Sequence, residues 1–121
     1  MGKIAFVFAG QGAQKPGMGK ELYDGFPAAK AVFDAVEAKR PGTLSLCFEG
    51  PQEELNLTNN TQPCLFAVDL ACARALESMG VSADGAAGFS LGEIPALAYS
   101  GLLKDAEALD LVITRAEAMT Q

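Results

Sequence analysis

Gly88-Phe89-Ser90-Leu91-Gly92 decides the fold, because it joins a small apolar run at residues 83–89 to a helix-forming run at residues 93–99. A Gly-x-Ser-x-Gly sequence between a strand and a helix is the pattern of a nucleophile elbow, a tight turn that projects the serine hydroxyl. Side chains at the two glycine positions would collide with neighbouring backbone. The first amides of the following helix, including that of Leu91, favour negative charge on an acyl oxygen. The segment therefore predicts Ser90 as a nucleophile and the Leu91 amide as an oxyanion donor, with a plain tight turn as the alternative.

A second strand is predicted near the start of the chain. Residues 3–9 are rich in β-branched and aromatic side chains and end at Gly10. This run favours a central strand buried on both faces over a surface strand of alternating polarity. Residues 10–19 contain four glycines and a proline and therefore form a loop. Because open α/β sheets place ligands beyond the ends of their strands, Gln11 either lies in a structural turn or supplies a second oxyanion contact.

Apolar residues at helical spacing predict three longer helices. The first covers residues 27–39, with Pro27 in its first turn. The second is capped by Thr61 and ends at Gly80. The third is capped by Asp105. The predicted buried stripes are Leu65, Val68, Cys72, Leu76 and Met79 in the second helix, and Leu109, Val112, Ala116 and Met119 in the third.

The order of these elements predicts an α/β layer architecture with a parallel sheet. Residues 44–60 are expected to add a short helix or turns. Two strands make a thin sheet for a complete α/β domain, so residues 1–121 are interpreted as part of a larger domain.

Composition excludes several functional classes. The chain has 121 residues, half of them hydrophobic and 20% charged, which is typical of one soluble globular domain. Its net charge of −6 argues against a nucleic acid partner. With no histidine, the sequence contains no imidazole base and no complete Ser-His-Asp system. A dinucleotide fingerprint is also excluded, because Lys15 stands where its third glycine is required.

The cysteines and the apolar runs indicate a cytoplasmic protein without a metal. Cys47, Cys64 and Cys72 have spacings that fit no zinc pattern, which favours reduced thiols and predicts Cys72 on the buried face of a helix. No apolar run approaches the length of a membrane span, and the start of the sequence lacks a signal-peptide core.

Arg115 is the remaining residue with chemical potential. It lies among alanines and aliphatic residues in the last predicted helix. A guanidinium is always charged and binds carboxylates through two parallel hydrogen bonds. Arg115 is therefore either a carboxylate-binding residue or a surface arginine paired with an acid such as Glu117.

Several motifs, in order along the chain, resemble the malonyl-CoA:acyl carrier protein transacylases. They are Phe6 to Gln14 with Pro16-Gly17-Met18-Gly19, then Asn60-Thr61-Gln62-Pro63, Gly88 to Glu93, and Arg115 to Met119. The same signature occurs in the acyltransferase domains of fatty acid and polyketide synthases. The resemblance implies an α/β-hydrolase-like core and a reaction in which a serine takes a malonyl group from malonyl-CoA and passes it to the phosphopantetheine thiol of an acyl carrier protein. It implies no cofactor and a place in fatty acid or polyketide synthesis.

The resemblance also implies a role for each matching residue. Ser90 is similar to the nucleophile, and the amides of Gln11 and Leu91 are similar to the oxyanion hole. Arg115 resembles the clamp for the malonyl carboxylate, which would favour malonyl over acetyl groups. Gln62 lies in a matching motif at the border of the site.

Two departures from the family pattern change what is expected of these residues. Phe89 replaces the histidine that usually precedes the nucleophile. Family members are also longer, so residues 1–121 correspond to an N-terminal portion that lacks the ferredoxin-like small subdomain and the catalytic histidine. The chain alone is accordingly expected to be inactive and to need a complementary chain that carries the base. The alternatives are a serine hydrolase of the α/β-hydrolase class and a noncatalytic half-domain.

Overall fold

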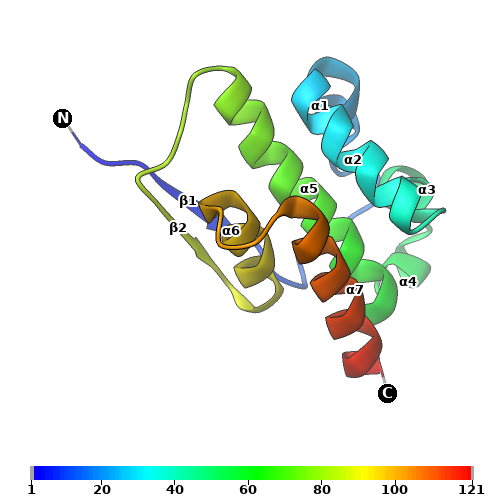
Figure 1. Cartoon of the computed structure of the whole chain (residues 1–121). Helices are drawn as coiled ribbons and strands as arrows, with labels where there is room; N and C mark the ends of the chain where they lie inside the picture. The colour runs from blue at the N-terminus through cyan, green and yellow to red at the C-terminus, as the bar shows by residue number, and fades with distance from the viewer. Residues whose placement is uncertain (1, 121) are drawn as a thin grey trace.

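The computed structural model describes residues 2–120 and forms an α/β fold. Along the chain, its elements are β1 (Ala5–Phe8), α1 (Lys20–Gly25), α2 (Pro27–Lys39), α3 (Thr43–Glu49), α4 (Gln52–Leu55), α5 (Thr58–Ser78), β2 (Gly85–Gly88), a 3-10 turn η1 (Ser90–Gly92), α6 (Glu93–Ser100) and α7 (Asp105–Thr120). The two strands pair in parallel, in a register that runs from Ala5 opposite Gly85 to Phe8 opposite Gly88. Figure 1 shows the strands at one end of the molecule and the long helix α5 between α2 and α7.

The core lies around α5. Its buried residues Phe66 and Leu70 pack with Phe33 of α2 and Val112 of α7. An aromatic cluster extends this core, since the Phe33 ring lies 5.9 Å from Tyr23 and 5.4 Å from Phe48. Helix α6 packs on one face of the sheet, where the Tyr99 ring lies 5.0 Å from the Phe6 ring and 6.2 Å from the Phe8 ring. The α5 layer therefore supports α6, and α6 supports the strands.

Most of the predicted elements are confirmed. Helix α2 has the predicted bounds with Pro27 at its start, and Val32, Phe33 and Val36 are buried. The 10–19 segment is a loop, and the region from 44 to 60 contains the short helices α3 and α4. The parallel pairing of the two strands agrees with the predicted architecture.

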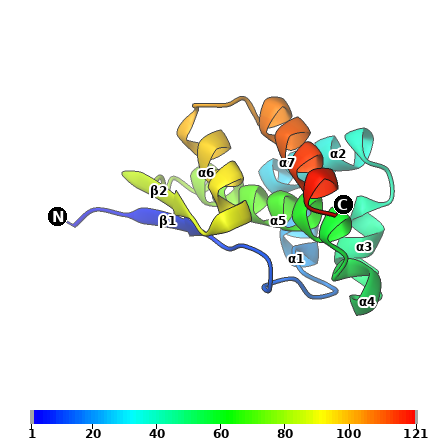
Figure 2. The same ribbon diagram turned by 90° about the horizontal axis from the view of Figure 1, so that it is seen from below.

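The prediction of a strand buried on both faces is wrong. β1 alternates between exposed and buried positions, and Val7 is 77% exposed. Figure 2 shows α6 on one side of the strands, whereas within residues 2–120 no element covers the other side. The apolar sequence of β1 therefore provides two apolar faces, of which one is packed.

The predicted start of the long helix is also wrong. Helix α5 begins at Thr58, and Thr61 lies inside it, buried. The Thr61 hydroxyl donates to the carbonyls of Leu55 and Leu57 instead of accepting from an amide as a cap does. Similarly, Asp105 is the first residue of α7 and pairs with Arg74 of α5 at 2.8 Å.

The predicted stripe of α5 was placed on the wrong face. Leu65 is buried, but Cys72, Leu76 and Met79 are exposed. Helix α5 packs against α2 and α7 through Phe66, Leu70 and small residues. Cys72 lies outside this packed face and is exposed. In α7 the prediction is closer, because Leu109, Val112 and Ala116 are buried and Met119 is exposed. No helix within residues 2–120 combines the length and hydropathy that crossing a bilayer requires.

Candidate functional site

The turn after β2 has the backbone of a nucleophile elbow. Ser90 has a φ of 55°, a left-handed conformation that is uncommon for a residue with a side chain. A Cβ at Gly88 would overlap the carbonyl of Gly92, and a Cβ at Gly92 would overlap the carbonyl of Phe8. Both glycines are therefore required sterically, as the sequence predicted, and the strained conformation is held by close backbone packing.

The helical turn that follows Ser90 orients the Leu91 amide. Ser90 begins η1, which continues directly into α6, and Gly92 donates its amide to the Phe89 carbonyl at 3.0 Å. The Leu91 side chain is fully buried, so the backbone of this turn is anchored in the core. Amides in the first turn of a helix have no intrahelical acceptor and carry the positive end of the helix dipole. A developing oxyanion at this turn is the kind of charge such amides stabilise.

Arg115 reaches the Ser90 hydroxyl from α7. Its Nη2 donates to Ser90 Oγ at 3.1 Å, and its Nη1 donates to Gln62 Oε1 at 2.7 Å. The pairing of Arg115 with Glu117 that the sequence left open is not among the ion pairs of the described residues. The guanidinium thus lies between two neutral groups, where it can bind a negatively charged ligand.

Gln62 connects this guanidinium to the glycine-rich loop. It is fully buried in α5, and its Nε2 lies 3.4 Å from Gln11 Oε1. Gln11 in turn donates to Thr58 Oγ1 at 3.5 Å. The structure therefore brings Ser90, Arg115, Gln62 and Gln11 together in one hydrogen-bonded chain, although they come from four segments far apart in the sequence.

The loop that carries Gln11 is fixed from both sides. Gly10 packs so closely against the Phe89 carbonyl that a Cβ would overlap it, which sets Gln11 beside the Ser90 turn. Farther along, Gln14 Nε2 donates to Asn56 Oδ1 at 3.0 Å, and the Gly17 amide donates to the Cys47 carbonyl at 2.8 Å. The loop is consequently held by amide hydrogen bonds to α4 and α3 despite its glycines.

Sequence reasoning missed two neighbours of this site. Thr58 contacts Gln11, and Met119 Sδ lies 3.3 Å from Gln62 Nε2. Met119 was assigned to the core stripe, but it is four residues after Arg115 and so lies on the same face of α7. That spacing is the signal that would have found it.

The cysteines and acidic residues form no metal site among residues 2–120, where no three potential ligands cluster. Cys47 and Cys64 are buried and donate weakly to backbone carbonyls of Cys64 and Thr43. The hydrogen bond with Cys64 and burial raise the pKa of the Cys47 thiol. A buried thiol of raised pKa, such as that of Cys47, is a poor nucleophile.

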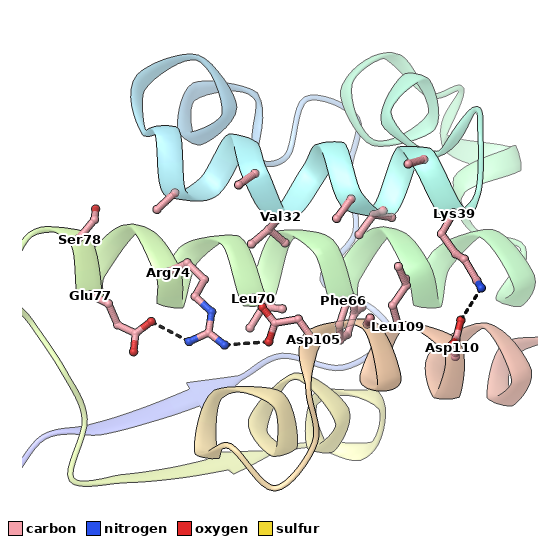
Figure 3. Close-up of a pocket in the computed structure, with 16 residues that line it drawn as sticks. Val32, Lys39, Phe66, Leu70, Arg74, Glu77, Ser78, Asp105, Leu109 and Asp110 are labelled. Carbon is pink, nitrogen blue, oxygen red and sulfur yellow. Dashed lines mark hydrogen bonds and ion pairs between the residues drawn. The ribbon is translucent and has the colours of Figure 1, made fainter.

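A separate groove of about 980 Å³ lies between α2, α5 and α7. Its floor contains Phe66, Leu70 and Leu109, and alanines of α2 form one wall. Figure 3 shows ion pairs along it, from Arg74 to Glu77 and Asp105, and from Lys39 to Asp110. None of the predicted site residues lines this groove.

The chain is similar to known acyltransferases over nearly its whole length. A family model described as an acyl transferase domain matches residues 5–121. The malonyl CoA-acyl carrier protein transacylase of Bacillus subtilis (strain 168) is 47% identical over 122 residues, which cover all of this chain and 38% of that protein.

Solved structures agree in fold. The acyltransferase domain from the second module of the salinomycin polyketide synthase superposes with a TM-score of 0.92 at 44% identity, covering 99% of this chain and 29% of that one. A type II polyketide synthase acyl-carrier protein in complex with its malonyl-transacylase gives a TM-score of 0.89 at 36% identity, over 98% of this chain and 39% of that one. The chain thus spans well under half the length of these relatives.

Proposed function

The chain belongs to the acyl transferase domain family, and from that premise we propose that it carries the nucleophile side of a malonyl transfer reaction. In this reaction Ser90 Oγ attacks the thioester carbonyl carbon of malonyl-CoA, the carbon–sulfur bond breaks, and CoA leaves as its thiol after taking up a proton. The phosphopantetheine thiol of an acyl carrier protein then attacks the Ser90 ester. That step transfers the malonyl group to sulfur and returns the proton to Ser90.

The hydrogen bond from Arg115 Nη2 to Ser90 Oγ, at 3.1 Å, is the observation that carries this proposal. A malonyl group on Ser90 Oγ has a carboxylate separated from the ester carbonyl by one methylene, so that carboxylate falls within reach of the same guanidinium. Arg115 binds it through charge-assisted hydrogen bonds that an acetyl group cannot form. This contact supports a carboxylated acyl group over the plain ester of a serine hydrolase.

The other site residues stabilise and orient the reacting groups. The amides of Leu91 and Gln11 donate to the oxyanion that forms on the carbonyl oxygen. Gln62, which is buried and accepts from Arg115 at 2.7 Å, holds the guanidinium in place. The reaction needs no cofactor.

The base that takes the Ser90 proton comes from outside these residues in our proposal. The sequence has no histidine, and an unactivated serine hydroxyl is a weak nucleophile at neutral pH. We accordingly assign the chain to part of an α/β-hydrolase-like core without the ferredoxin-like small subdomain, acting in the cytoplasm with a complementary chain that supplies the histidine. The isolated chain is expected to be inactive.

Intact-mass measurement after exposure to malonyl-CoA tests this function. The intact mass is measured for two samples. One is the chain alone, and the other is the chain co-expressed with the part of the Bacillus subtilis transacylase outside the matched region. We expect one malonyl adduct in the co-expressed sample, its loss in Ser90→Ala, and its retention in the control Ser45→Ala, whose serine is exposed on α3. An adduct that persists in Ser90→Ala, or no adduct in either sample, would contradict the proposal.

A further inference from the structure

The sheet has a second face that no element of residues 2–120 covers. Phe6 and Phe8 point toward Tyr99 of α6, so the alternate residues of β1 point the opposite way. Val7 lies on this opposite side and is 77% exposed. Phe89 continues the extended backbone of β2, donates its amide to the Phe8 carbonyl at 3.1 Å, and is 74% exposed. We call this surface the open sheet face; it consists of Ala5, Val7, Ala9, Ala87 and Phe89.

Every residue of the open sheet face is apolar and exposed. Parallel sheets occur almost entirely with both faces covered, and their strands are correspondingly apolar on both sides. A solvent-facing sheet would instead alternate apolar with polar residues. The composition of the open sheet face is therefore that of a buried surface, and a contiguous apolar patch of this kind marks a contact with another polypeptide.

The groove between α2, α5 and α7 is a weaker candidate for such a contact. Its charged residues already pair with one another, Lys39 with Asp110 at 2.9 Å and Arg74 with Asp105 at 2.8 Å. Neither Ser90 nor Arg115 lines it. By contrast, Phe89 of the open sheet face directly precedes Ser90.

We propose that the open sheet face is the docking surface for the remaining part of an acyl transferase domain, and this inference rests on the proposed function. The chain matches 38% of the Bacillus subtilis transacylase and 29% of the salinomycin acyltransferase domain, so most of each relative lies outside the match. A polypeptide on this face meets the rim of the Ser90 turn through Phe89. It is thereby positioned to bring a base to the hydroxyl.

Co-purification tests the docking surface without any measurement of activity. The tagged chain is co-expressed with the part of the Bacillus subtilis transacylase outside the matched region, and the amount of that part recovered with the tag is measured. Val7→Lys places a charge in the centre of the open sheet face, and burying it unpaired is expected to reduce recovery by about tenfold or more. Ala87→Lys, at the position that pairs with Val7, is expected to do the same.

Leu102→Lys is the matched control. Leu102 is 75% exposed, nearly the same as Val7, and lies between α6 and α7 away from the sheet. Its substitution is expected to leave recovery within about twofold. Since Val7 and Leu102 are both exposed, neither variant removes a core contact, and circular dichroism of each chain alone should show unchanged helix content.

Three results would overturn the proposal. They are equal recovery with Val7→Lys and Leu102→Lys, no recovery with the unsubstituted chain, and a homodimer of the chain alone that Val7→Lys converts to a monomer in light scattering. The last result assigns the face to a second copy of this chain. If the second part is recovered but no malonyl adduct forms, the proposed function is contradicted and the docking surface is supported. If the adduct forms equally well with Val7→Lys, the docking surface is contradicted and the proposed function is supported.

Discussion

Close backbone packing of the residues on both sides of Ser90 fixes its position. Its left-handed φ of 55° is imposed by a turn in which Gly88 lies against Gly92, and Gly92 against Phe8. The strained residue is thus fixed before any ligand is present, which reduces the reorganisation needed during reaction.

Gly88→Ala is expected to destabilise the chain by about 3 kcal/mol or more, because its methyl group would overlap backbone that no rotamer change can move. Gly85→Ala is the control in the same strand, where a Cβ meets no atom within 4 Å. Its effect should stay within about 1 kcal/mol. Urea unfolding of both variants measures the difference, and equal stabilities would contradict the steric role of Gly88.

Gln62→Glu tests the role of the buried amide. A glutamate at this position would form an ion pair with Arg115, whose Nη1 lies 2.7 Å from the Gln62 oxygen. In the co-expressed assembly, malonyl labelling of Ser90 should fall by about ten- to a hundredfold, while acetyl labelling from acetyl-CoA should change little. The acetyl label serves as the control, because it needs Ser90 but not the carboxylate contact of Arg115. An equal loss of both labels would indicate a structural effect and contradict the positioning role.

At the scale of elements, α5 lies at the centre of the core and also carries a buried carboxyl group. Asp69 lies in α5 with its Oδ2 buried and without a hydrogen-bond partner among the described residues. Burial raises the pKa of this carboxyl from 3.8 to about 7. The folded chain therefore favours the protonated form.

Asp69 should make stability depend on pH. As the pH rises above 3.8, the unfolded chain releases the proton more readily than the folded one, so stability falls until the pH passes the folded pKa of about 7. The full loss is roughly 4 kcal/mol at most. Asp69→Asn should flatten this decline in urea unfolding between pH 4 and 8, whereas Asp24→Asn, at an exposed carboxylate paired with Lys20, should retain it. A decline of the same size in Asp69→Asn would contradict the assignment.

Local chemistry explains which elements were predictable from the sequence. Pro27 and the spacing of Val32, Phe33 and Val36 specify α2 within one segment, and the prediction was correct. The steric role of Gly88 was predictable for the same reason, since Gly88 packs against the backbone of Gly92 only four residues away, whereas Gly92 packs against Phe8 on the neighbouring strand. The start of α5 could not be predicted in this way. Thr61 resembles a helix cap in the sequence, but in the fold its hydroxyl donates to backbone carbonyls.

At the scale of the whole molecule, long-range contacts set the limit of prediction. Sequence motifs selected Gln11, Gln62, Ser90 and Arg115, but only the fold brings them into one chain of hydrogen bonds. The burial of the sheet was mispredicted because composition records that a face is apolar and not which polypeptide covers it. Val7 and Phe89 are apolar, yet both side chains are exposed in the described residues.

The cysteines provide a probe of global unfolding. Cys47 and Cys64 are buried between α3 and α5, whereas Cys72 is exposed. A thiol reagent should therefore modify one site in the native chain and the other two at the rate of unfolding. Cys72→Ser should remove the native reaction alone. Prompt labelling of all three thiols would contradict the buried placement of Cys47 and Cys64.

The pairing of β1 with β2 has a consequence for the order of events during synthesis. Ala5 pairs with Gly85, so eighty residues separate partners that lie side by side in the sheet. Closing so long a loop is slow, and domains form while the chain is still emerging from the ribosome. The helices α1 to α5 precede β2 along the chain, so all of their residues are synthesised before β1 can pair with β2. Until Gly88 emerges, the apolar strand β1 has no strand to pair with, and unpaired apolar strands of this kind are the segments that chaperones protect from aggregation.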